Sequence, residues 1–181
     1  MGFTTGSGTV GGVSPSDVQG IINTNTGWAQ YSDTQHTSGS PLVILEGNTG
    51  VITNNALSVI DSQLPAGITS LYDPVTNKIT PENSGDAYML RIDFTAFTNN
   101  QAGLATVELD IGAPQNEILR RGFTFPKGTG ISNGIELSTS TLIYTLDTFL
   151  ANGGSVELRS DVGNTSIYDI SFVISRVHKA N

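Results

Sequence analysis

Apolar and polar residues alternate with a period of two in several segments of the chain, as they do in strands that bury one face. In AYMLRIDFTAF, one face of the strand carries Tyr88, Leu90, Ile92 and Phe94. The same alternation recurs in LATVELDI and in SIYDISFVISRV, where it places Tyr168 and Ile170 on the buried face. These three segments are therefore predicted to be half-buried β-strands.

Further strands are predicted at residues 28–32, 42–45, 57–60, 118–125, 135–146 and 156–159. The segments between them are short and rich in Gly, Asn, Asp and Pro, the residues that form turns. A longer loop is expected at residues 70–86, where DPVTNKI predicts a tight hairpin turn. Because no long helical pattern separates the strands, the sequence predicts an all-β protein, an antiparallel jelly-roll β-sandwich, rather than an α/β enzyme.

The chain is predicted to consist of an N-terminal arm and short helix, residues 1–26, followed by the jelly-roll domain, residues 27–181. The first 13 residues are mostly Gly, Thr and Ser. The segment SPSDVQG then carries a helix-start pattern, with Ser14 as cap, Pro15 at the first helical position and Asp17 in the first turn. We expect this helix to end after one or two turns, at Gly20.

Charge excludes one class of partner. The formal net charge is -8, the pI is about 4.4, and the first basic residue along the chain is Lys78. Because nucleic-acid binders need a basic surface, nucleic acid is not an expected partner. The start of the chain lacks a signal-peptide pattern, and the sequence has no apolar run long enough to span a membrane, so we expect a soluble protein made in a cytoplasm without a membrane partner.

None of the common catalytic or metal-binding patterns fits well. The chain has no cysteine, and its glycine-rich segment GTGISNG lacks the lysine of a phosphate-binding loop. Glu108 and Asp110 are expected to keep a strand face soluble, and His36 lies near Asp33 in a polar loop. We therefore expect no catalytic residue and no cofactor, and leave an irregular calcium site between Asp73 and Asp86 open.

The only adjacent pair of basic residues, Arg120 and Arg121, lies between apolar residues in ILRRGFTFPKG. In an extended strand Arg121 shares a face with Phe123 and Phe125, unless a bulge at Gly122 changes the phase. An arginine on an apolar face is tolerated where it meets a carboxylate at a subunit interface. We therefore predict a structural ion pair with one of the acids on neighbouring strands, which are Asp93, Glu108, Asp110, Glu117 and Glu136. The alternative is an exposed arginine at the edge of a loop.

Aromatic residues leave glycan binding open as an alternative. The candidate stacking platforms are Trp28, Tyr31, Tyr72, Tyr88, Tyr144 and Tyr168. Tyr88 and Tyr168 fall in phase with predicted core residues, and a single Trp at the start of a strand is more often a plug in a core or interface. Most of these rings are therefore predicted to be structural.

Four segments, taken in order along the chain, resemble a known family. They are WAQYSDTQHTSGSPLVI, GDAYMLRIDFTAFTNNQAGLATVELDIG, RRGFTFPKG and the strands from SNGIEL to ISRV. Together they are similar to the tumour-necrosis-factor-like jelly rolls of tailed-bacteriophage virions. The resemblance covers about Trp28 to Val177 and consists of alternation and turns. It implies a homotrimer in which one sheet of each protomer packs against its neighbours, in a capsid decoration or cement protein, a head fibre or the knob of a tail fibre.

No fibre shaft precedes the jelly roll, which favours a protein planted on the outer capsid surface of the virion. We therefore expect a trimeric decoration or cement protein, not an enzyme, that stabilises a phage head by binding the major capsid protein. The expected interface residues are Phe3, Val10, Val13, Arg120, Arg121, Phe123 and Tyr144.

Three alternatives remain open. The first is a fibre knob that binds a receptor or host glycan through the loops at residues 70–86 and 98–103. The others are a glycan hydrolase or esterase, and a bacterial β-sandwich interaction module.

Overall fold

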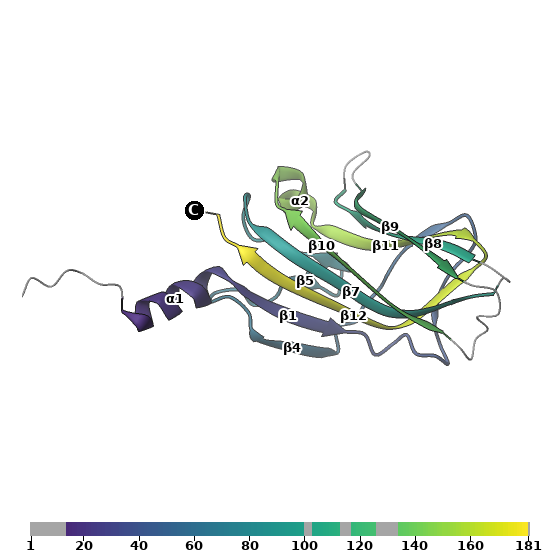
Figure 1. Ribbon diagram of the computed structural model, residues 1–181, viewed down its shortest axis with the longest axis horizontal. Helices are drawn as coiled ribbons and strands as arrows, with labels where there is room; N and C mark the ends of the chain where they lie inside the picture. The colour runs from purple at the N-terminus through teal and green to yellow at the C-terminus, as the bar shows by residue number, and fades with distance from the viewer. Residues whose placement is uncertain (1–13, 100–102, 113–116, 126–133, 181) are drawn as a thin grey trace, which may run out of the picture.

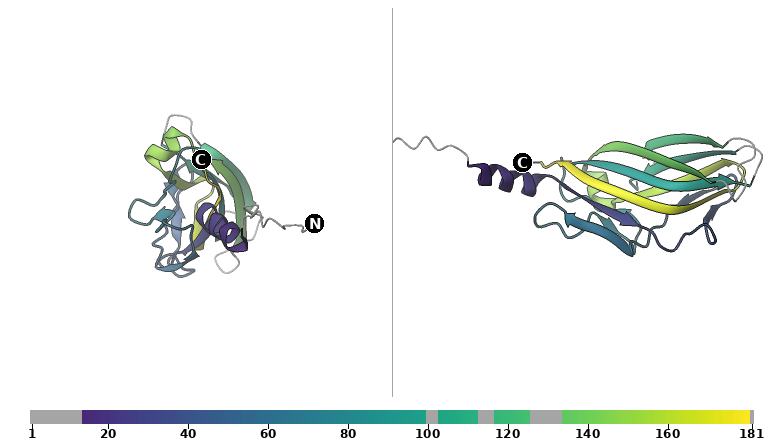
Figure 2. Two further views of the ribbon diagram at one scale, coloured as in Figure 1. Left: turned by 90° about the vertical axis from the view of Figure 1, so that its left-hand side faces the viewer. Right: turned by 60° about the horizontal axis from the view of Figure 1, so that its bottom comes forward.

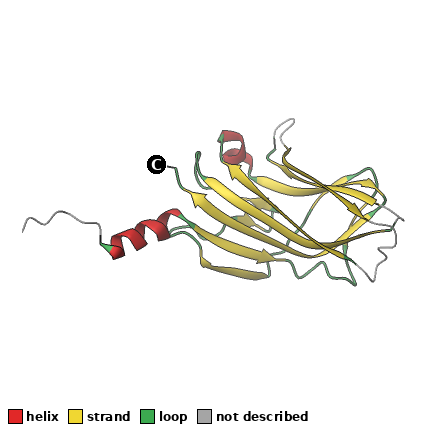
Figure 3. Ribbon diagram, in the orientation of Figure 1, coloured by secondary structure: helices red, strands yellow, loops and turns green. Residues whose placement is uncertain are grey.

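Two antiparallel β-sheets pack face to face in the computed structural model, which describes residues 14–99, 103–112, 117–125 and 134–180 (Figures 1 and 3). The front sheet has the strand order β10-β7-β12-β1-β4, with β2 paired to β12. Its strands are β1 (Gly27–Ser32), β2 (Leu42–Ile44), β4 (Ser58–Gln63), β7 (Ala87–Thr98), β10 (Ile135–Tyr144) and β12 (Thr165–His178).

The back sheet has the order β5-β6-β11-β8-β9, with β3 paired to β11. Its strands are β3 (Thr49–Val51), β5 (Tyr72–Asp73), β6 (Lys78–Ile79), β8 (Gly103–Asp110), β9 (Glu117–Phe125) and β11 (Gly154–Val162). The chain crosses between the sheets after β2, β3, β4, β6, β7, β9, β10 and β11, so each sheet is built from strands that are distant in sequence. This arrangement is the predicted jelly-roll sandwich.

The core lies between the sheets and follows the predicted alternation. Tyr88, Leu90 and Ile92 are fully buried. Phe172 of β12 meets the ring of Tyr72 edge-on, with 5.4 Å between the ring centroids. The predicted turn in DPVTNKI is confirmed as the tip of the hairpin between β5 and β6, where Asn77 has a φ of 55°.

Helix α1 (Pro15–Asn25) is longer than predicted. Ser14 and Asp17 form a capping box, as the sequence suggested, but the helix continues through Gly20. A glycine inside a helix costs only about 1 kcal/mol relative to alanine, and it does not by itself end the helix. The helix ends instead at Thr26, whose backbone N–H and hydroxyl both donate to the carbonyl of Ile22.

Three further elements differ from prediction. Strand β10 ends at Tyr144 rather than at residue 146, and helix α2 (Asp147–Asn152) follows it because Phe149 is buried in the core. Short strand β3 occupies a segment predicted to be a turn. In β12, Tyr168 is half-buried while Ile167 and Ile170 are both buried, because a bulge between residues 168 and 171 shifts the phase.

Paired charges cover the outer face of the back sheet. Glu108 of β8, with only 3% of its side chain exposed, forms ion pairs with Arg120 of β9 at 3.1 Å and Arg159 of β11 at 3.3 Å. Arg159 also donates to Asp161 at 2.7 Å, and the hydroxyl of Thr106 donates to the same carboxylate at 2.9 Å. The structural ion pair is therefore made by Arg120 within one protomer.

Arg121 shares the inner side of β9 with Phe123, as the alternation predicted, and its ion pair with a carboxylate at a subunit interface stays a prediction. Arg121 lies opposite Val107 on the inner side of β9, yet its side chain is exposed because β9 is the edge strand of the sheet. The register shift in this pair of strands falls between Glu108 and Asp110 of β8, not at Gly122. Glu108 and Asp110 likewise do not form an open acidic face, because the two arginines cover Glu108.

A buried ion pair fixes the end of the front sheet from which α1 projects. Arg176 of β12 lies 3.6 Å from the carboxylate of Asp86, and both side chains are almost wholly buried. Burial raises the pKa of the Tyr88 hydroxyl to about 12, so the hydroxyl remains protonated and donates to Asp86 at 3.1 Å. The Arg176 guanidinium also donates to the carbonyl of Asn25 at 3.0 Å and so ties the last residue of α1 to the sheet.

We predict that Arg176→Met lowers the free energy of unfolding by about 3–5 kcal/mol, because it leaves Asp86 buried without its cation. Arg91→Met is the matched control: Arg91 pairs with Asp93 at 2.9 Å, but 57% of its side chain is exposed, so its loss should cost less than about 1 kcal/mol. Urea unfolding at one protein concentration measures both variants. Equal losses would contradict this assignment.

A second prediction concerns Asp161. Partial burial raises the pKa of this carboxyl, but donation from Arg159 and Thr106 outweighs it and holds the pKa below the usual 3.8. A group whose pKa is lowered by folding stabilises the protein above its unfolded pKa, and this stabilisation is lost as the pH falls through the folded value. Between pH 6 and pH 3 the native protein should therefore lose more stability than Asp161→Asn, by up to about 1 kcal/mol. Unfolding curves at the two pH values test this, and parallel losses would refute it.

Candidate functional site

The outer face of the front sheet is uncovered along β10, β7, β12, β1 and β4. Figure 2 shows this face with no helix of the described chain lying across it; α1 leaves from one end of the sheet. Residues directly opposite each other on neighbouring strands share a face, so the strand register defines rows of side chains across the sheet. These rows differ in chemistry from one end of the face to the other.

Apolar side chains gather in the rows near α1, where they alternate with a few polar ones, and the row that reaches β4 at Ile60 also contains Arg91. One row runs from Leu142 through Met89, Ser175 and Trp28 to Gln63. Leu142 is 63% exposed and Met89 38% exposed, while Trp28 is half-buried. The adjacent rows add an exposed tyrosine on β10 and an exposed isoleucine on β4. We call this set the apolar band, and it consists of Trp28, Ile60, Met89, Leu142 and Tyr144.

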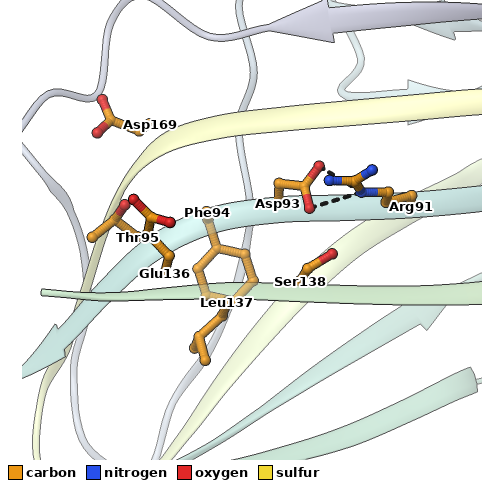
Figure 4. A pocket seen from close by; sticks show the side chains of 8 residues that line it. All are labelled: Arg91, Asp93, Phe94, Thr95, Glu136, Leu137, Ser138 and Asp169. Carbon is orange, nitrogen blue, oxygen red and sulfur yellow. Dashed lines mark hydrogen bonds and ion pairs between the residues drawn. The ribbon is translucent and has the colours of Figure 1, made fainter.

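The rows at the other end of the face are polar. We call one of them the serine row, and it consists of Ser138, Asp93, Ser171, Ser32 and Ser58. Beside it a shallow hollow of about 470 Å³ is lined in part by Arg91, Asp93, Glu136 and Asp169 (Figure 4). Figure 4 shows the Arg91 side chain directed at Asp93, to which it donates at 3.0 Å.

The sequence-predicted interface residues are divided by the structure. Tyr144 is 60% exposed within the apolar band. Arg120 lies on the outer face of the back sheet, and Phe123 points into the sandwich, where its ring meets that of Phe94 at 6.0 Å. Phe3, Val10 and Val13 lie outside the described residues. The described members of the predicted set therefore lie on different faces of the sandwich.

Met89 and Leu142 are absent from the predicted interface residues, although both break the polar half of an alternating strand and TLIYTL, which contains Leu142, has apolar residues on both strand faces. In AYMLRIDF the positions between core residues carry Met89, Arg91 and Asp93, so a methionine stands where a polar residue is usual. Leu142 and Tyr144 flank the buried Ile143 in the same way. An apolar residue at a position of the strand that faces outward could have indicated an interface. Only the strand register, however, shows that these residues lie side by side.

The candidates for catalysis have structural roles. The Nε2 atom of His36 lies 2.7 Å from the hydroxyl of Thr53, and not beside a carboxylate. Asp33 instead accepts from the backbone N–H groups of His36 and Asn55, at 2.6 and 2.9 Å. This carboxylate therefore fixes two loops rather than orienting an imidazole.

The acids between residues 73 and 86 do not converge. Asp73 accepts from the backbone of Val75 and the hydroxyl of Thr76 in its own turn, and Asp86 belongs to the buried ion pair with Arg176. Within the described residues, no group of three or more His, Asp or Glu side chains is placed to hold a metal ion. Nor is any described helix long and apolar enough to cross a membrane.

About half of the aromatic rings considered as platforms for a glycan are buried in the core. Tyr31, Tyr72 and Tyr88 are buried, and each hydroxyl is hydrogen-bonded inside the protein. Tyr168 is half-buried and packs against Phe97. Trp28 and Tyr144 remain accessible, on β1 and β10. Three strand spacings of about 4.8 Å separate these strands, a distance of about 14 Å, so the two rings do not enclose one sugar.

Neither a protein-family model nor a curated protein sequence matches this chain. Among solved structures, it is similar to the structure of Eiger TNF from S. frugiperda, with 7% identity and a TM-score of 0.47 over 87% of this chain and 95% of that one. It is similar to the PRD1 vertex protein P5, with 15% identity and a TM-score of 0.45 over 86% and 98%. It is also similar to a carbohydrate-binding module from Cellvibrio mixtus lichenase 5A in complex with cellotriose, with 12% identity and a TM-score of 0.40 over 87% and 90%.

Proposed function

We propose that the protein is a non-catalytic structural protein of a phage virion, which forms a homotrimer through the outer face of its front sheet and binds the major capsid protein as a decoration or cement protein. The observation that carries the proposal is the contrast between its two outer faces. Paired charges cover the back sheet, whereas the front sheet exposes the uncharged apolar band.

The apolar band crosses most of the front sheet, although Ser175 of β12 lies between Met89 and Trp28. It extends across four strand spacings from β10 to β4, or about 19 Å. Soluble monomers rarely expose contiguous apolar patches of more than a few hundred Å², and larger ones mark interaction sites. A protein partner that covers this band would bury side chains that the protomer leaves in water.

A second and third copy of the chain are the occupants that fit this face best. The protein carries a formal net charge of -8, so two copies repel each other, and burial of an uncharged apolar surface is the contact best able to outweigh that repulsion. The five side chains of the apolar band carry no charge, and Arg91, which lies in the same row as Ile60, pairs with Asp93. The resemblance of the sequence to trimeric virion jelly rolls supports closed threefold symmetry over an open chain of copies.

The role in the virion is supported by that resemblance and by the neutral polar surface, since only 13% of the residues are charged. In the proposed trimer the back sheets face outward, and their ion-paired side chains suit a surface in water. A receptor- or glycan-binding knob is the alternative. It would use the same trimer but carry its specificity in loops.

We predict that Met89→Glu dissociates the trimer, because it places one carboxylate per copy in the centre of a dry interface. Light scattering should give a native mass of about three times 19.0 kDa for the native protein and 19.0 kDa for the variant. The emission of Trp28, the only tryptophan, should shift to the red in the variant as its ring becomes hydrated.

Val162→Glu is the matched control for Met89→Glu. Val162 is 42% exposed on the back sheet, close to the 38% of Met89, and its replacement should leave the native mass unchanged. A monomeric native protein, or a Met89→Glu variant that remains trimeric, would refute the proposed assembly.

A decoration protein should be present in many copies, and heads that lack it should be less stable. Quantitative gel densitometry of purified virions measures the copy number, and release of DNA on heating measures the stability of heads with and without the gene. Few copies together with a loss of adsorption and intact heads would instead identify the receptor-binding knob. A full decoration phenotype in Met89→Glu virions would show that trimer formation is not required.

A further inference from the structure

Helix α1 projects beyond the end of the front sheet instead of packing against the sandwich (Figures 1 and 2). Val18, Ile21 and Ile22 are 45%, 56% and 48% exposed, although a spacing of three and four residues gathers them on one side of the helix. An isolated helix of 11 residues is marginal in water. The described part of this protomer therefore exposes an apolar stripe on a helix that needs packing.

The direction of this helix is fixed by its base. Arg176 donates to the carbonyl of Asn25, and Thr26 closes the last turn, before the chain enters β1 at Gly27. Arg176 is itself held by the buried Asp86. The helix is therefore joined to the front sheet by a buried ion pair as well as by the chain.

The apolar stripe is continuous with the apolar band. A hollow of about 700 Å³ is lined by Ile22 and Gln19 of the helix, by Trp28 of β1 and by Gln63 at the end of β4. Ile22 and Trp28 thus face the same space. One partner that covers the band would reach the helix without crossing a charged surface, since the only charged residue of α1 is Asp17 in its first turn.

We infer that the three α1 helices of the trimer pack in parallel around its axis and form a short three-helix bundle that extends the sheet interface. This inference rests on the proposed trimer. A threefold rotation about an axis along the sheets places the same end of every copy together, so each helix meets two identical helices. Each apolar stripe then lies against two others, and the helix gains the packing that it lacks in the protomer.

Single cysteines test the bundle directly, because the native chain has none. Ile21→Cys lies on the apolar stripe, and Gly20→Cys lies on the opposite side of the same helix, where an added Cβ meets nothing within 4 Å. After mild oxidation, a non-reducing gel should show most Ile21→Cys chains in a disulfide-linked dimer and few Gly20→Cys chains. The third chain of each trimer remains unlinked.

Native mass separates the failure of this inference from the failure of the trimer. A trimeric Ile21→Cys protein with no cross-link, or with no more cross-link than Gly20→Cys, refutes the bundle and leaves the proposed function standing. A monomeric native protein refutes both.

Loss of apolar packing provides a second test. The double variant Ile21→Ser/Ile22→Ser should raise the concentration at which the trimer dissociates at least tenfold, because six isoleucines leave the bundle. Val75→Ser is the control, since Val75 is 87% exposed at the tip of the hairpin between β5 and β6 and distant in the chain from α1. An unchanged dissociation midpoint in the double variant would overturn the bundle, whereas equal shifts in both variants would show that the effect is not specific to the helix.

Discussion

A sheet in a two-layer sandwich can bury only one of its faces within the protomer, so its other face stays at the surface. The properties of this protein depend on how the side chains on those two outer faces differ. The back sheet carries charge on its outer face: Glu108 lies between Arg120 and Arg159 and forms an ion pair with each. The front sheet leaves Met89 and Leu142 in water. The back sheet is thus covered by its own ion pairs, whereas the proposed trimer would cover the front sheet.

The sequence predicted the sandwich because alternation and turn residues are local signals. Tyr88, Leu90 and Ile92 are buried as their spacing required. The errors arose where long-range packing overrode local preference. The bulge beside Asp169 moved Tyr168 out of the core phase, and burial of Phe149 produced α2 where a turn was expected.

The candidate site was harder to predict, because it is made by register rather than by any one segment. Tyr144 was identified from its own strand, but the row that joins Leu142, Met89 and Trp28 uses strands separated by more than 50 residues. The two arginines show the same limit. Alternation identified which of them shares a face with the aromatic residues, but only the pairing of β8 with β9 shows that Glu108 lies opposite Arg120 and that Arg121 is at an open edge.

The change from the apolar band to the serine row also gives the front face a direction. A neighbouring copy that slid along the strands by one row, about 7 Å, would begin to place apolar side chains on hydroxyl groups, and a copy turned end for end would do so completely. In the proposed trimer the polar rows around Asp93 would enclose water near the axis, while the rows around Met89 exclude it. The front face would thus select one alignment of the copies, because any other alignment would place apolar side chains against water or hydroxyl groups.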